Sequence, residues 1–169
     1  MPRNLEIKVK VDSLVPYRRR AAALPGCRKA GVLRQTDRYF RGARGYLKLR
    51  VVAGGVSELI AYERPKRRGV RESRFVTCPV EAPGATGRVL TAAFGADAVV
   101  KKTRELFLLD DARIHLDRVS GLGAFVEIEV LTERAGGRAA GLMRDLCEYL
   151  QLPAETTPGS YRDLMGGGH

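Results

Sequence analysis

The segment at residues 4–11, NLEIKVKV, alternates strictly between polar side chains and aliphatic ones. Successive residues of a β-strand point to opposite faces, so this pattern predicts a strand with two unlike faces. One face carries only apolar side chains. The other carries charged or amide side chains: Asn4, Glu6, Lys8 and Lys10. A chain that repeats this pattern must bury its apolar faces and accommodate a concentrated set of charges.

The same alternation recurs at residues 46–50, 102–104, 113–117 and, with acids in place of bases, 125–129. Turn signals separate most of these segments. The pattern predicts strands at about 3–11, 31–41, 45–53, 57–65, 70–79, 99–109, 112–119 and 123–131. Helices are predicted at about 13–24, 85–94 and 134–150, with Ser13 as the N-cap of the first. We therefore predict an α+β fold with about eight antiparallel strands.

Two arrangements of such strands are open. In the first, the apolar faces meet the helices or each other, and the charged faces are exposed to solvent, as in many antiparallel sheets. In the second, the sheet closes into an eight-stranded barrel with helices on its apolar outside and charges in its interior, which holds side chains or one small ligand. The clustering of cations opposite clustered acids favours the second, as a site for a polyanion carrying a divalent metal.

The chain has 30 Lys and Arg against 19 Asp and Glu, and its net charge of +11 suggests an anionic partner without identifying it. No apolar run approaches the roughly 18–20 residues that a membrane helix needs. The N-terminus, MPRNLEIKVK, lacks the apolar core of a signal peptide. Cys27, Cys78 and Cys147 are odd in number and far apart, as expected of reduced thiols. These features predict a cytoplasmic protein that does not enter a membrane.

A resemblance to a known family is carried by NLEIKVKV, QTDRYF (35–40), YLKLR (46–50), LIAYERP (59–65), VVKKTRELFL (99–108), IHLDRVSGLGAFVEIEV (114–130) and SYRDLM (160–165). In this order and spacing, the segments resemble the CYTH family of class IV adenylyl cyclases and thiamine triphosphatases, the triphosphate tunnel metalloenzymes. Bacterial class IV adenylyl cyclase-like proteins are the most similar. The resemblance implies one CYTH-like domain over 1–169. It also implies a closed eight-stranded antiparallel barrel with helices packed outside, whose tunnel grips a triphosphate beside Mg²⁺ or Mn²⁺.

One position departs from the family's pattern. The first strand of the family carries Glu-x-Glu-x-Lys, and here Asn4 stands at the first Glu position, Glu6 at the second and Lys8 at the Lys. The Asn carbonyl can still coordinate a cation, but it brings no charge to it. The departure leaves open how many metal ions bind and whether the protein is fully active.

The resemblance also implies the site residues. The metal ligands would be Glu6, Glu127, Glu129 and Asp117, with Asn4 as a further candidate. The triphosphate-binding residues would be Lys8, Lys10, Lys48, Arg50, Arg64, Lys102 and Arg104. Asp117 and Lys8 are the predicted catalytic residues, although Asp117 could instead orient a neighbouring Arg or Lys, or position water. Asp37, Arg71, Lys101 and His115 are weaker candidates that could be structural, and the runs 18–20 and 66–68 are most simply solvated.

By this resemblance, the protein is expected to be a Mg²⁺- or Mn²⁺-dependent enzyme that converts ATP to cyclic AMP and pyrophosphate. Two alternatives stay open. One is hydrolysis of tripolyphosphate, thiamine triphosphate or a nucleoside triphosphate in the same tunnel. The other is a non-catalytic binding module for polyphosphate, nucleotide or RNA. The expected partner is a small triphosphate rather than a nucleic acid, because the charges alternate along strand faces. A homodimer is compatible with the family, although no sequence feature establishes one.

Overall fold

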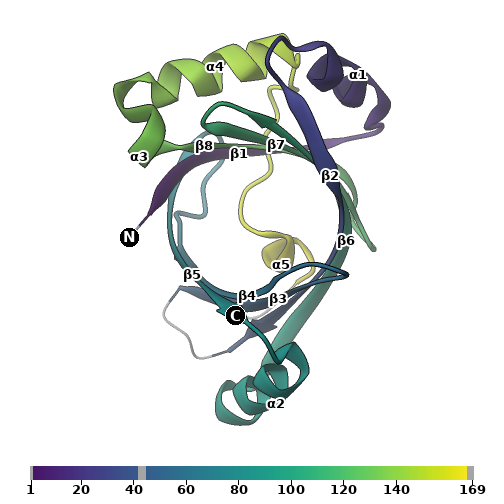
Figure 1. Cartoon of the computed structure of the whole chain (residues 1–169), viewed down its shortest axis with the longest axis vertical. Coiled ribbons are helices and arrows are strands. Elements are labelled where there is room, and N and C mark those ends of the chain that lie inside the picture. Colours follow the sequence, from purple (N-terminus) through teal and green to yellow (C-terminus); the bar gives the residue numbers. More distant parts are fainter. Residues whose placement is uncertain (1, 42–44, 167–169) are drawn as a thin grey trace.

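Eight antiparallel strands close into a barrel in the computed structural model, which describes residues 2–41 and 45–166 (Figure 1). Around the ring the strands follow the order β1-β5-β4-β3-β2-β6-β7-β8. Their bounds are β1 Arg3–Val11, β2 Arg28–Phe40, β3 Tyr46–Val52, β4 Ser57–Glu63, β5 Arg71–Val80, β6 Ala96–Leu109, β7 Ala112–Val119 and β8 Gly123–Leu131. The closed arrangement is therefore confirmed over the open sheet with one solvated face.

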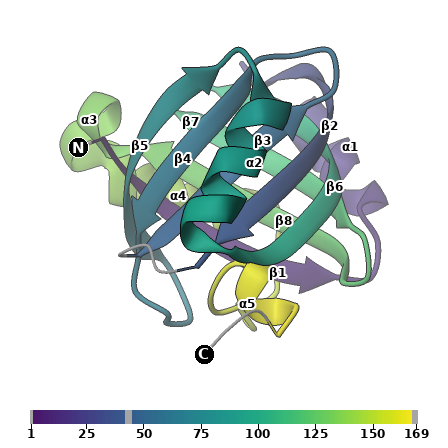
Figure 2. The same ribbon diagram turned by 90° about the horizontal axis from the view of Figure 1, so that it is seen from below.

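Short helices surround this ring. They are α1 Val15–Ala23, α2 Pro83–Phe94, α3 Thr132–Ala135, the 3-10 turn η1 Gly136–Arg138, α4 Ala139–Tyr149 and α5 Tyr161–Leu164. α4 packs on β8 and β1, α1 on β7, and α2 on β2 and β3, all outside the barrel (Figures 1 and 2). α5 instead lies across one end of the barrel, a position that the sequence did not predict. None of the helices in the described part of the chain is long and apolar enough to span a membrane.

The main apolar core lies between the barrel wall and the outer helices, not inside the barrel. Ile128 on the outer face of β8 is fully buried there, in one cluster with Met143 and Leu146 of α4. Burial of each such side chain stabilises the fold by roughly 1.5–3 kcal/mol. Because side chains alternate along β8, the neighbours of Ile128 at Glu127 and Glu129 point the opposite way, into the barrel. The outer core therefore fixes which charges enter the interior.

The helix predictions need two corrections. The first helix begins at Val15 rather than at 13, with Leu14 at its N-cap, while the Ser13 hydroxyl accepts a hydrogen bond from the Val15 N–H at 3.2 Å. The helix predicted at 134–150 is broken into α3, η1 and α4. Gly136 ends α3 with φ of 55°, a left-handed conformation that glycine adopts without strain. Two successive glycines interrupt the helix although the apolar spacing continues through them.

Two strands begin earlier than the alternation indicates, β2 at Arg28 and β6 at Ala96 rather than near 31 and 99. These two strands pair with each other, and their register shifts between Lys29 and Gly31 and again between Arg38 and Phe40. A bulge adds a residue on one strand and breaks the period of two that reveals a strand in the sequence. The pattern therefore located the regular part of each strand and missed its extension.

Candidate active site

Side chains on the inner faces of the strands surround a cavity of about 240 Å³. Thr77 and Arg113 line it and are exposed, which marks its opening, whereas most of its charged lining is buried. Seven cationic and four acidic side chains line the wall: Lys8, Lys48, Arg50, Arg64, Lys102, Arg104 and Arg113, with Glu6, Glu58, Glu127 and Glu129. Cations therefore outnumber acids on the wall of the cavity.

Asp117 lies behind this wall and holds three of its side chains. Arg104 donates from Nε to Oδ1 at 2.7 Å and from Nη2 to Oδ2 at 2.6 Å, and the Tyr161 hydroxyl donates to Oδ2 at 2.8 Å. Lys102 Nζ lies 3.4 Å from the same oxygen. Burial alone would raise the pKa of Asp117, but Arg104 and Lys102 outweigh it and lower that pKa. With both oxygens engaged, the geometry favours the orienting role that the sequence left open over metal ligation.

Asp37 of β2 does the same for two side chains of the neighbouring strand β3. It is 1% exposed and accepts two hydrogen bonds from Arg50, both at 2.8 Å, and one from Lys48 at 3.0 Å. Burial and the nearby Arg50 lower the pKa of Lys48 to about 7, and burial and Arg104 lower the pKa of Lys102 to about 8. From the sequence Asp37 was a weak candidate, since it could be structural or face outward, and the structure shows it buried and paired.

Glu6 is held by two arginines through one of its two oxygens. Arg64 donates to its Oε1, and the Nε of Arg71 donates to the same oxygen at 2.8 Å. Arg71 is fully buried and also donates to the backbone carbonyls of Thr157 and Gly159, both at 3.1 Å. Glu6 and Arg71 therefore join β1 to the segment that leads into α5. The weak candidate Arg71 is a central structural contact of the site.

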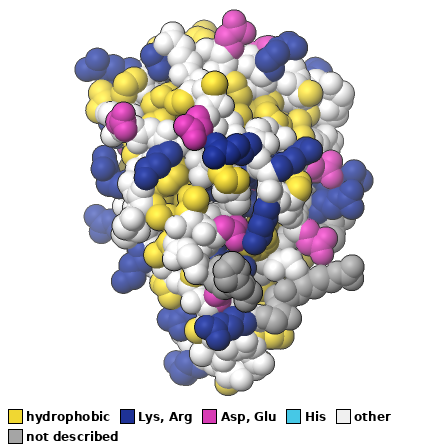
Figure 3. Space-filling model, turned by 180° about the vertical axis from the view of Figure 1, so that it is seen from behind, with side chains coloured by type: hydrophobic (Ala, Val, Ile, Leu, Met, Phe, Trp, Pro, Cys, Tyr) yellow, Lys and Arg dark blue, Asp and Glu magenta, His cyan; other side chains and the backbone are white. Residues whose placement is uncertain are grey.

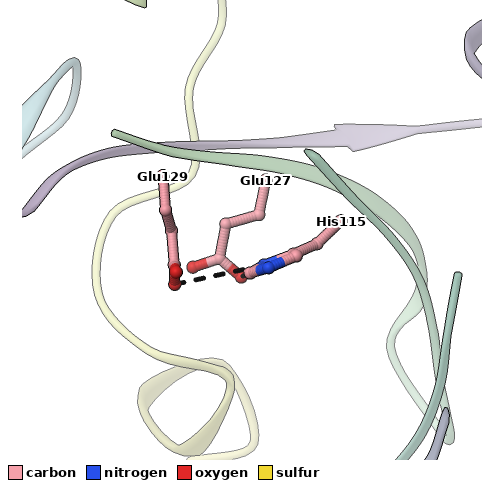
Figure 4. Close-up of side chains that lie close together, drawn as sticks. All are labelled: His115, Glu127 and Glu129. Atoms are coloured by element: carbon pink, nitrogen blue, oxygen red, sulfur yellow. Dashed lines mark ion pairs between the residues drawn. The ribbon is translucent and has the colours of Figure 1, made fainter. Parts of the chain in front are cut away.

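Glu127, Glu129 and His115 bring their side chains together on β7 and β8 (Figure 4). One ligand atom from each lies within 4.8 Å of the others. Glu127 also lies 3.6 Å from Lys8 and accepts a hydrogen bond from Arg104 at 3.1 Å. Burial would raise the pKa of Glu127, but Lys8, His115 and Arg104 hold it well below its ordinary value. Both of these carboxylates line the cavity, and the low pKa keeps Glu127 ionised.

These carboxylates fit the divalent cation that the family implies. Mg²⁺ is usually held by one or two carboxylates together with substrate phosphates, and Glu127 and Glu129 supply that number at the cavity wall. On the β1 side, Asn4 is neutral and its buried Oδ1 has no hydrogen-bond partner, while Glu6 is bound by two arginines. Among the described residues, the ligand atoms that cluster closely enough for one cation thus belong to β7 and β8.

Tyr161 of α5 was absent from the predicted site. Its ring packs edge-on against Phe125 with centroids 5.0 Å apart, and Lys8 Nζ lies 4.0 Å from the centre of the Tyr161 ring. One local signal could have located the helix. Ser160 and Asp163 form a capping box, in which each side chain bonds the other's backbone N–H. The spacing S-x-x-D is readable in the sequence, but the depth to which Tyr161 enters the barrel is not.

Replacing Tyr161 with Ala is expected to destabilise the protein by about 3–5 kcal/mol, the usual loss for a buried aromatic ring. Tyr161→Phe keeps the ring and removes only the hydrogen bond to Asp117, so about 1–2 kcal/mol is expected. Urea unfolding followed by circular dichroism measures both. Tyr149→Ala, at a tyrosine that is 40% exposed, is the matched control. A Tyr161→Ala variant as stable as that control would show that α5 contributes nothing to closure of the barrel.

The remaining predicted cations lie at or outside the edge of the cavity. Lys10 shares the inner face of β1 but is exposed and does not line the cavity, because it lies near the end of the strand. Lys101 is exposed on the outer face of β6. Arg18 pairs with Glu105 outside the barrel, and Arg68 pairs with the exposed Glu155. On the face shown in Figure 3, Lys and Arg side chains are scattered rather than gathered into one patch.

Tripolyphosphate binding at pH 8 is expected to take up protons. With a pKa of about 7, Lys48 is mostly neutral at that pH in the free protein, and Lys102, at about 8, is half neutral. An anion beside them raises both pKa values, so protons enter with the ligand and affinity falls as pH rises from 7 to 9. Titration calorimetry in HEPES and in Tris measures the uptake. Lys48→Met should reduce it, and heats that do not depend on the buffer would contradict this assignment.

Comparison with known proteins supports this description of the fold. The sequence model of the CYTH domain matches residues 2–141. No match was found among curated protein sequences. The solved structure of the PH1012 protein from Pyrococcus horikoshii OT3 superposes with a TM-score of 0.83 at 24% identity, covering 95% of this chain and 98% of that one.

Two further structures extend the comparison. A candidate adenylate cyclase from Vibrio parahaemolyticus has a TM-score of 0.76 at 19% identity, covering 96% of this chain and 97% of that one. A candidate adenylyl cyclase from Hippeastrum, described as having a dominant triphosphatase activity, has a TM-score of 0.70 at 15% identity, covering 98% of this chain and 95% of that one. At these identities the likeness shows the shared barrel fold. By the match over residues 2–141, the chain belongs to the CYTH family.

Proposed function

We propose that this protein is a metal-dependent enzyme that acts on a triphosphate bound inside the barrel. One observation carries the proposal: seven cationic side chains line a cavity whose wall also presents the acid pair Glu127 and Glu129. Buried like charges repel each other strongly, and their desolvation is costly. Such a cluster is hard to explain as a structural feature, because an apolar interior would be more stable. A polyanionic ligand accounts for it.

The cations divide into fixed and adjustable groups. Arg104 and Arg50 are held by bidentate bonds to Asp117 and Asp37, so their guanidinium groups are oriented before a ligand arrives. Lys102 and Lys48 have lowered pKa values and gain full charge when an anion binds. Charge-assisted hydrogen bonds from both kinds of group to phosphate oxygens would supply affinity and position. Preorganisation by the two aspartates reduces the cost of ordering the site at binding.

Glu127 and Glu129 would hold Mg²⁺ or Mn²⁺. When bound, the cation neutralises charge on phosphate oxygens and orients the reacting group. Lys8 lies 3.6 Å from Glu127 and is 2% exposed, so it would contact the phosphate chain beside the acid pair. Asp117 would act as a positioning residue through Arg104. The barrel wall and α5 exclude bulk water from this charged interior and so strengthen each electrostatic contact.

Two reactions use this arrangement. In the cyclase reaction, the ribose 3′-hydroxyl of ATP attacks the α-phosphorus, and pyrophosphate leaves. In the hydrolase reaction, water attacks the terminal phosphate of tripolyphosphate, thiamine triphosphate or a nucleotide. The cavity volume favours tripolyphosphate, which has no organic group, because about 240 Å³ lies below the roughly 300–1,000 Å³ of sites that enclose a drug-sized molecule. A phosphate chain would fill it, leaving an organic group at the opening near Thr77 and Arg113.

The purified protein should be incubated with Mg²⁺ or Mn²⁺ and, separately, ATP, tripolyphosphate and thiamine triphosphate. Cyclic AMP with pyrophosphate identifies the cyclase reaction, and orthophosphate identifies hydrolysis. We expect orthophosphate from tripolyphosphate. Tight binding of all three compounds without turnover would overturn the enzyme proposal and leave a binding module. RNA binding that weakens steeply with salt would indicate a surface site instead of the cavity.

A further inference from the structure

We infer that His115 is a third ligand of the cation site, and that its nitrogen makes the site select Mn²⁺ over Mg²⁺. The inference rests on the proposed function, which places a divalent cation at Glu127 and Glu129. It goes beyond that proposal, because the proposed function assigns only Glu127 and Glu129 to the cation and gives no role to His115. The evidence is the burial of the ring, an unpartnered nitrogen and the two carboxylates that face it (Figure 4).

The His115 side chain is almost fully enclosed, with 3% of the residue exposed. Its Nδ1 is buried and has no hydrogen-bond partner. Buried polar atoms are nearly always hydrogen-bonded, because leaving one unpaired costs about 1–3 kcal/mol. Asn4 Oδ1 and Arg64 Nε are likewise buried without a partner, whereas Arg104 is paired with Asp117. An orphaned nitrogen at this depth therefore indicates a ligand.

The surroundings of Nδ1 identify the kind of ligand. Glu127 Oε2 lies 3.8 Å from Nδ1 and Glu129 Oε1 lies 4.0 Å from it, both too long for a hydrogen bond. Two donors that share a cation at about 2.1–2.2 Å are separated by no more than about 4.4 Å. Both separations fit that limit. Glu129 is only half-buried, so it has room to adjust. Two carboxylates and a nitrogen lone pair around one point form a set that a divalent cation completes.

The elements explain why these three groups converge. β7 and β8 pair so that His115 lies directly opposite Glu127, and Arg113 directly opposite Glu129. Residues two apart on β8 share the inner face, which brings Glu129 to the diagonal position from His115. The outward neighbours Ile114 and Ile128 are fully buried in the apolar core and fix this register. The site is therefore built on two rigid strands rather than on a loop.

The chemical types of the three donor groups determine which metal the site prefers. Mg²⁺ takes oxygen ligands almost exclusively, whereas first-row transition cations accept imidazole as well. A site of two carboxylates and one imidazole keeps the charge that a hard cation needs and adds a nitrogen that Mg²⁺ gains little from. The neutral Asn4 lies on β1, the strand that pairs with β8, and brings no charge to the site. Between the two cations that the family uses, Mn²⁺ accepts both the carboxylates and the imidazole and is therefore favoured over Mg²⁺.

Electron spin-echo spectroscopy of bound Mn²⁺ tests this directly. We expect modulation from a directly bound ¹⁴N nucleus in the wild-type protein, measured with and without tripolyphosphate. His115→Asn, which places an amide oxygen or nitrogen near the Nδ1 position, should lose the imidazole modulation. Its Mn²⁺ affinity, followed by the signal of free Mn²⁺, should fall about tenfold, while Mg²⁺ affinity by competition changes less than threefold. Since His169 is the chain's other histidine, the variant also assigns the signal.

Nitrogen modulation that is absent from the wild-type protein in both conditions, or unchanged in His115→Asn, would overturn the inference. Its failure is distinguishable from failure of the proposed function. Turnover of tripolyphosphate with Mn²⁺ bound but no nitrogen coupling leaves the enzyme proposal standing and removes His115 from the site. Nitrogen coupling without turnover of any triphosphate keeps His115 as a metal ligand and removes the enzyme proposal.

Discussion

Replacing Glu127 with Gln is expected to lower metal-dependent turnover at least about 100-fold, since even residues that only support metal ligands contribute 10–100-fold. The amide has nearly the same shape and can still accept a hydrogen bond from Arg104, so the barrel should stay folded. What changes is the charge opposite Lys8 and Arg104, which lie 3.6 and 3.1 Å from the carboxylate. Steady-state release of orthophosphate or cyclic AMP measures the loss.

The same variant should bind tripolyphosphate without metal at least as tightly as the wild-type protein, because one negative charge has left the cavity. This separation of binding from turnover is the expected signature of a metal ligand. Glu105→Gln is the matched control. Glu105 is ion-paired with Arg18 and Lys29 outside the barrel, so its loss should alter stability and leave turnover unchanged. Equal turnover in the Glu127→Gln and Glu105→Gln variants would contradict the proposed role of Glu127.

Lys102→Met is expected to weaken tripolyphosphate binding by about 10–100-fold, the equivalent of roughly 1.5–3 kcal/mol for a hydrogen bond to a charged group. Lys102 is 6% exposed and lines the cavity, whereas its neighbour Lys101 points outward into solvent. Lys101→Met makes the same chemical change one residue away and should leave affinity within about twofold. Asp117 keeps its two bonds from Arg104 in the Lys102→Met variant, so that network remains paired.

Titration calorimetry with tripolyphosphate measures both variants at one ionic strength, because screening alters all these interactions. If the two variants bind equally, the surface cations bind the ligand as well as the interior ones, and the cavity is not the site. Lys102→Met should also raise the melting temperature of the ligand-free protein, since it removes a buried cation whose pKa burial lowers. A gain in stability with a loss in affinity is the pattern expected of a functional residue.

Much of the barrel could be predicted because the alternation of polar and apolar residues is a local pattern, readable within each strand. Alternation in β1, β3, β7 and β8 assigns the charged residues of those strands to one face, apart from Arg3 and Arg118, and the structure keeps that assignment for Lys8, Lys48, Asp117 and Glu127. Alternation alone did not decide whether that face points to solvent or to the interior. That choice depends on closure of the ring by β1 and β8, a contact between strands more than a hundred residues apart.

Pairing inside the cavity could not be predicted, because it depends on distances across the ring. Arg71 and Glu6 are adjacent on paired strands, yet nothing in the sequence indicates that Arg71 also binds the carbonyls of Thr157 and Gly159. Asp37 is similar, since its contact with Arg50 follows from the β2–β3 register. Some charged residues bind the ligand, and others hold the ligand-binding residues in place. Both kinds are Lys, Arg, Asp or Glu at alternate positions of a strand, so the sequence does not tell them apart.

A crystal structure of the protein with tripolyphosphate and Mn²⁺ is the most direct test of the central claim, that the cavity binds a triphosphate beside a cation. We predict phosphate density inside the barrel in contact with Lys8, Lys102 and Arg104, and an anomalous peak for Mn²⁺ at Glu127 and Glu129. Tripolyphosphate bound instead at the surface arginines of α1 or at residues 66–68, with no phosphate in the cavity, would contradict it.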